Sequence, residues 1–107
     1  MIREIDKSTF DREVGERGAI SIVDFFTPDC PTCCALGKVF EQVAAEQTDI
    51  KFFKVDLEED ITLAERFSID HIPTLIIFRD GEPIKTNVGY LEAPELTEFL
   101  YHRKVLL

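Results

Sequence analysis

Residues 22–33 read IVDFFTPDCPTC. It begins with an apolar run that is typical of a buried strand, and it ends with two cysteines three positions apart, Cys30 and Cys33. The cysteines open a segment with helical periodicity. A CxxC pair in this setting is typical of a reversible disulfide, although the same spacing also occurs in zinc sites.

A zinc site is the weaker interpretation of the pair. Structural zinc needs four ligands, and the other candidates are Cys34, His71 and His102, none of which has a second ligand at the usual spacing. At the start of a helix, by contrast, unpaired N–H groups and the helix dipole stabilise a thiolate. Pro31 suits the first helical turn, where its missing N–H costs no intrahelical bond. The sequence therefore predicts a redox pair and no metal site.

Composition limits the class of protein. The chain has 107 residues, 45% of them hydrophobic and three of them cysteines, so we expect a single domain over 1–107 that apolar burial stabilises. A net charge of −9 disfavours nucleic acid and anionic membranes as partners. No signal-peptide pattern and no apolar run near the ~20 residues of a membrane span are present, so a cytoplasmic protein is expected.

Short apolar runs and turn residues predict alternating strands and helices. Strands are expected at 2–5, 19–26, 50–55, 74–78 and 84–88, and helices at about 8–18, 31–46, 61–67 and from 94 onward. Asp80-Gly81 favours the positive φ angles of a tight hairpin turn between the last two strands. This order predicts an α/β fold, with a central mixed sheet of four to five strands and about four helices on both faces.

Local signals predict how two of the helices are built. Ser8 and Thr9 precede acidic residues and are expected to cap the first helix. Ile61, Ala64 and Phe67 recur at helical spacing and are expected to share one face of the third helix.

The chemistry is expected to centre on the two cysteines and the strand before them. Cys30, at the helix start, is the candidate nucleophile, and Cys33, one turn inward, is the candidate resolving thiol. Asp24 interrupts an apolar strand: if it is buried, its pKa rises and it becomes a general base for Cys33, and if it points to solvent it has no such role. Lys54 is either its countercharge or a solvated lysine.

These pieces resemble the thioredoxin family over nearly the whole chain. The matching motifs stand at thioredoxin spacings: residues 22–26 before CxxC, Lys54-Val55-Asp56, Ile72-Pro73-Thr74, Phe78 with Gly81, and Val88-Gly89. The resemblance implies the thioredoxin fold, a nucleophilic Cys30, a resolving Cys33 and a buried Asp24 near Lys54.

The resemblance also implies a substrate groove. In it, Pro73 forms a cis peptide bond beside the disulfide, Ile72 offers backbone hydrogen bonds to a substrate chain, and Gly89 keeps the rim open. From the residues alone, a proline at the start of the strand at Thr74 marks a turn, an edge or a cis bond.

The sequence departs from the family pattern around the cysteines. The usual Trp-Cys-Gly-Pro-Cys is replaced by residues 29–33, DCPTC, and the chain has no tryptophan. Asp29 opposes a thiolate on its neighbour, whereas His71 on the proline loop could offset that charge. Pro31 and Thr32 between the cysteines resemble more oxidising family relatives, such as glutaredoxins.

We therefore predict a monomeric thiol–disulfide oxidoreductase that reduces protein disulfides through a reversible Cys30–Cys33 disulfide. It needs no bound cofactor and draws electrons from a separate thioredoxin reductase, flavin- or ferredoxin-linked. The alternatives are a non-catalytic thioredoxin-like binding module, a more oxidising glutaredoxin-like or isomerase-like exchanger, and a metal carrier that uses Cys30, Cys33 and Cys34. Otherwise Cys34 is expected to be a small, half-buried residue or a regulatory thiol.

Overall fold

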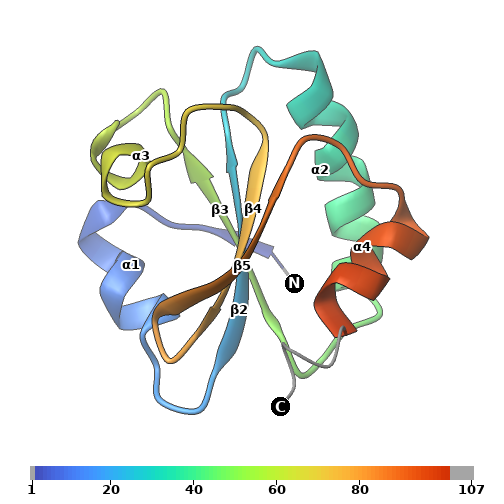
Figure 1. Cartoon of the computed structure of the whole chain (residues 1–107), viewed down its shortest axis with the longest axis horizontal. Helices are drawn as coiled ribbons and strands as arrows, with labels where there is room; N and C mark the ends of the chain where they lie inside the picture. Colours follow the sequence, from blue (N-terminus) through green and yellow to red (C-terminus); the bar gives the residue numbers. More distant parts are fainter. Residues whose placement is uncertain (1, 102–107) are drawn as a thin grey trace.

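The computed structural model describes residues 2–101 and shows one five-stranded sheet with helices on both faces (Figure 1). The strands are β1 (Ile2–Glu4), β2 (Ile20–Phe26), β3 (Lys51–Asp56), β4 (Thr74–Arg79) and β5 (Glu82–Val88). The helices are α1 (Lys7–Val14), α2 (Pro31–Ala44), α3 (Thr62–Arg66) and α4 (Ala93–Tyr101). The strand order is β1-β3-β2-β4-β5; the first two pairings are parallel and the last two antiparallel. The predicted mixed sheet is confirmed.

The apolar run before the cysteines forms the central strand. Residues 21–25 of β2 are all buried, because β3 and β4 pair with its two edges and helices cover both faces. On one face α2 and α4 contribute side chains such as Phe40 and Leu96 to a core, and on the other α1 and α3 contribute Phe10 and Leu63 (Figure 1). Each such side chain contributes about 1.5–3 kcal/mol by leaving water. The segment that contains the cysteines therefore follows directly from the central strand of the sheet.

The predicted hairpin turn is confirmed. Asp80 and Gly81 have φ angles of 52° and 84°, as a turn with two left-handed residues requires. A Cβ on Gly81 would lie 3.1 Å from the Cα of Gly15, so a side chain there would also collide with the chain after α1.

The predicted cap of the first helix is wrong. Asp6, rather than Ser8 or Thr9, is the N-cap of α1, and its carboxylate accepts hydrogen bonds from the N–H groups of Ser8 at 3.0 Å and Thr9 at 3.2 Å. A second hydrogen bond runs the other way, in which the Thr9 hydroxyl oxygen accepts from the Asp6 N–H. The two N–H groups lie two and three residues after Asp6, as the geometry of an N-cap requires, so the cap lies before the two hydroxyl residues. The helix also ends earlier than predicted, at Val14.

Ile61 is not part of a buried helical face. α3 is only five residues long and begins after Ile61, whose side chain is 63% exposed. Leu63 and Ala64 are buried instead, and Phe67 packs partly buried against the same core. Ile61 lines the same surface groove as Ile72, the residue before Pro73.

Replacing Asp6 by Ala should lower the free energy of unfolding by about 1 kcal/mol, because two N–H groups lose their acceptor. Ser8→Ala is the matched control, because it keeps both cap bonds, and it should cost clearly less. Urea unfolding of the two variants measures the difference, and equal losses would contradict the assignment of the cap.

Candidate active site

Cys30 is held at the N-terminus of α2. It is the N-cap residue, and its Sγ accepts a hydrogen bond from the backbone N–H of Cys33 at 3.1 Å. Pro31 follows at the start of the helix, as predicted. This sulfur therefore lies at the end of the helix where the backbone N–H groups lack intrahelical acceptors and the dipole is positive. The side chain is partly exposed, so this sulfur can meet a second molecule.

Cys33 has the opposite environment. It lies one turn further along α2 and is 4% exposed. Burial is the main reason that its pKa is raised to about 12, and the hydrogen bond to Cys30 adds to the effect, whereas a backbone hydrogen bond from Thr27 opposes it. Both cysteines are free thiols here, and the backbone N–H of Cys33 is in direct contact with the Cys30 sulfur. The pair thus combines an accessible sulfur with a shielded one.

Asp24 is buried in the central strand. Its side chain has no exposed surface, and within residues 2–101 neither carboxylate oxygen has a hydrogen-bond partner. Burial raises its pKa to about 7, although the charge of Lys54 acts in the other direction. The charge on Asp24 in turn raises the pKa of Cys33, so the two groups affect each other. Of the two orientations left open by the sequence, the buried one is present, and the group is poised to exchange a proton near neutral pH.

Lys54 lies beside Asp24 without contacting it closely. The two residues are partners in the parallel register of β2 and β3, yet among the described residues no ion pair within 4.0 Å joins them. The Lys54 ammonium instead lies 4.4 Å from the centre of the Phe26 ring. Sequence reasoning missed Phe26, although its spacing of two from Asp24 places both side chains on one face of the strand.

Pro73 adopts the cis form that the resemblance implies, in the Ile72–Pro73 bond. The Pro73 carbonyl accepts a hydrogen bond from the Gly89 N–H at 2.9 Å, which ties the two sides of the predicted groove together. Thr74 is 3% exposed, and its hydroxyl donates to the His71 carbonyl at 2.6 Å. Its side chain therefore anchors the loop from beneath.

The structure places the remaining predicted residues on the surface. His71 has an exposed side chain whose Nδ1 lies 2.9 Å from a carboxylate oxygen of Asp70, a partner that sequence analysis did not consider. Asp29 and Thr32 are exposed on either side of Cys30 and Pro31. Cys34 is exposed rather than half-buried, and its Sγ lies 3.8 Å from the Pro28 carbonyl oxygen.

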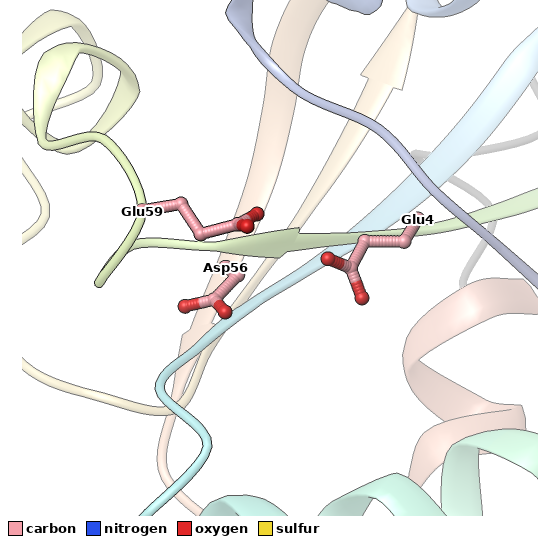
Figure 2. A group of neighbouring side chains, drawn as sticks. All are labelled: Glu4, Asp56 and Glu59. Atoms are coloured by element: carbon pink, nitrogen blue, oxygen red, sulfur yellow. The ribbon is translucent and has the colours of Figure 1, made fainter.

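The structure gives no support to metal carriage by the cysteines. Among residues 2–101, the one group of three or more potential ligands within 4.8 Å of one another is Glu4, Asp56 and Glu59 (Figure 2). The three cysteine sulfurs do not form such a group, and His102 lies outside the described residues. Carboxylates exposed in this way commonly gather without an ion.

Comparison with known proteins identifies the family. The thioredoxin family model matches residues 1–102, which is nearly the whole chain. The chain belongs to the thioredoxin family. It is 33% identical to thioredoxin from Listeria monocytogenes over 101 residues, which cover 94% of this chain and 96% of the relative. It is 34% identical to thioredoxin 1 from Synechococcus elongatus over 97 residues, with 90% and 91% covered.

A third relative, thioredoxin from Mycoplasmoides gallisepticum, is 37% identical over 79 residues, 74% of this chain and 79% of its own. The chain is therefore a protein thiol–disulfide oxidoreductase. Family members generally act on disulfide-containing proteins, receive electrons from a reductase and work through a redox-active disulfide without a bound cofactor. No helix within the described part of the chain is long and apolar enough to cross a membrane.

The buried carboxyl of Asp24 should make stability depend on pH. Its pKa is 3.8 in a model compound and about 7 in the fold, so folding takes up a proton between these values and stability falls as pH rises through this window. Asp24→Asn removes this dependence. Its stability advantage over the parent should grow by roughly 2 to 3 kcal/mol between about pH 5 and pH 8.

Urea unfolding at both pH values measures this change. Asp29→Asn, a matched change at an exposed carboxylate, is the control and should follow the parent at both pH values. An advantage of Asp24→Asn that does not change with pH would refute the buried, neutral carboxyl.

Proposed function

We propose that this thioredoxin reduces disulfides in other proteins, with Cys30 as the nucleophile and Cys33 as the resolving thiol. The observation that supports this order of attack is the contrast between the two sulfurs. Cys30 is reachable and accepts a helix N-terminal hydrogen bond, whereas Cys33 is buried with its pKa raised to about 12. A sulfur that stays protonated and shielded cannot attack first, so it waits for the intermediate.

The reaction has two displacements. The Cys30 thiolate attacks one sulfur of the target disulfide, which forms a mixed disulfide and releases the other target sulfur as a thiolate. Asp24 then accepts the proton of Cys33, directly or through one water, and the Cys33 thiolate attacks the Cys30 sulfur. The Cys30–Cys33 disulfide forms, and the second target sulfur leaves and is protonated. Burial and a pKa of about 7 support Asp24 as this base, with Lys54 tuning its charge.

The target segment is proposed to lie against the loop at Pro73. Ile72 precedes the cis bond and is 36% exposed, so its backbone is accessible to an extended chain. Gly89 has a φ of 98°, and a Cβ there would meet no atom within 4 Å, so the rim is open where the segment would pass. Thr74 supports the loop from beneath.

We further propose a cytoplasmic monomer that folds as a single domain over 1–107 and binds no cofactor. A separate thioredoxin reductase, flavin- or ferredoxin-linked, would return two electrons to the Cys30–Cys33 disulfide. A reducing compartment suits this cycle, since the pair must be reopened after each turnover.

A more oxidising exchanger is the second candidate, because Pro31 directly follows Cys30. The reduction potential separates the two hypotheses. The reduction potential of a general reductant is about −270 mV, whereas those of isomerases and strong oxidants are about −180 to −120 mV.

The roles of the cysteines are tested in a Cys34→Ser background, which removes the exposed third thiol. This background should reduce insulin at the parent rate. Adding Cys30→Ser should abolish turnover, and adding Cys33→Ser should instead accumulate a stable mixed disulfide with the target, visible by mass spectrometry. Turnover that survives Cys30→Ser would overturn the proposal.

The role of Asp24 is tested in single-turnover reactions at about pH 7. Asp24→Asn should leave the first attack by Cys30 near the parent rate and slow release of the mixed disulfide by about 100-fold, the lower range for a lost general base. If the two steps slow equally, Asp24 does not act on Cys33.

A further inference from the structure

An apolar groove continues from the Pro73 loop toward α3. It encloses about 230 Å³ and is floored by Leu57, Ala64 and Ile69 between Ile61 and Ile72. Ile61 is 63% exposed, which is unusual for a side chain of this size beside a packed helix. Because Ile72 belongs both to this groove and to the cis bond, a segment held at Pro73 can extend into it.

Exposed carboxylates lie at the groove and next to Cys30. Asp70 lines the groove with a side chain that is 85% exposed, and Asp29 is exposed directly before Cys30. Among the described residues that line the groove, none is Lys or Arg. His71 lies beside Asp70 and is the one lining residue that can become cationic.

Two basic side chains of α1 and α3, Lys7 and Arg66, are paired with carboxylates. Arg66 of α3 pairs with Asp11 at 2.9 Å and stacks 5.5 Å from the centre of the Phe10 ring, on the α1 side. Lys7 pairs with Asp60 at 3.1 Å, and these two charges offset each other.

Lys85 of β5 reaches the other face of the sheet. Its ammonium donates to the Phe99 carbonyl at 3.4 Å and lies 4.8 Å from the centre of that ring, beneath α4. Among the described residues that line the apolar groove, Asp70 is the one carboxylate and His71 the one side chain that can carry a positive charge.

We infer that this thioredoxin selects disulfides in extended segments that carry Lys or Arg next to the reacting cysteine, with Asp29 and Asp70 as specificity residues. An apolar side chain of the segment enters the groove beside Ile61 and Ile72. This inference rests on the proposed function and names its substrate class. A second copy of the chain is a poor occupant, because its own groove would bring the same negative charges.

Matched peptides test the inference. Each is a disulfide-bonded peptide with a leucine beside one cysteine, and the pair differs only in two flanking residues, Lys in one and Glu in the other. At about pH 8, where imidazole is uncharged, and low ionic strength, kcat/KM for the Lys peptide should exceed that for the Glu peptide about five-fold. At about 1 M salt, where the screening length falls to about 3 Å, the ratio should approach one.

Variants assign the preference to residues. Asp29→Asn and Asp70→Asn should each reduce the ratio by about half, and the double variant should remove most of it. Glu46→Gln makes the same charge change beyond the far end of α2, away from the cysteines, and should leave the ratio unchanged. Ile61→Ser should raise KM for both peptides alike, since it affects the apolar contact and not the charges.

The outcomes are distinguishable. If neither peptide shows turnover that depends on Cys30, the proposed function fails, and this inference fails with it. If both peptides are reduced equally well at low salt, or if Glu46→Gln lowers the ratio as much as Asp70→Asn, the enzyme stands and the inference is wrong. A dimer in sedimentation that loses the preference on dilution would show that a second copy occupies the groove, and would overturn it as well.

Discussion

The hydrogen bond from the Cys33 N–H to the Cys30 sulfur is the interaction on which the site depends. It forms because the chain leaves the buried strand β2, turns, and begins α2 at Pro31. The two sulfurs are about one helical turn apart along the axis, and their surroundings differ. The N-cap sulfur faces solvent and the positive end of the helix, while its partner is 4% exposed. Two identical side chains thus acquire different chemistry from position alone.

The polar interior beneath α2 serves the shielded cysteine. Asp24 is fully buried, and no group in the described part of the chain forms a hydrogen bond with its carboxylate, which is an unfavourable environment for a carboxylate in a structural role. Lys54 is close enough to moderate its pKa but is held over the Phe26 ring. A fully paired Asp24 would stay ionised and bind protons weakly, and without any nearby cation it would bind them too tightly. The observed arrangement keeps it near neutrality, at a cost in stability.

The surface that meets a partner is assembled from distant segments. Cis Pro73 and Gly89 are joined by a backbone hydrogen bond, and Ile61 approaches from the turn before α3. An apolar floor supplies contact area without regard to sequence, whereas the exposed carboxylate of Asp70 discriminates between charged segments. The same thioredoxin scaffold can therefore acquire a preference among targets through side chains that never touch the reacting sulfurs.

Several features were predictable from the sequence because their causes are local. The run at 22–26 is apolar on both faces except at Asp24, which predicts a central strand, and Asp80-Gly81 allowed little besides a tight turn. Pro31 after Cys30 marked the start of α2 in the same way. The cap at Asp6 was missed because three adjacent polar residues offer similar local signals, and only the folded backbone selects among them.

Tertiary structure decided the rest. Whether Asp24 is buried depends on β3, β4 and α2 closing over it, since an acidic residue in a strand can face either way. Likewise, the exposure of Ile61 follows from where the five-residue helix α3 begins, because Ile61 precedes its first turn. The sequence alone determined the strands, the helix that begins at the cysteines and the family. The environment of each charge came from packing, because burial and Coulomb interactions depend on residues far apart in the chain.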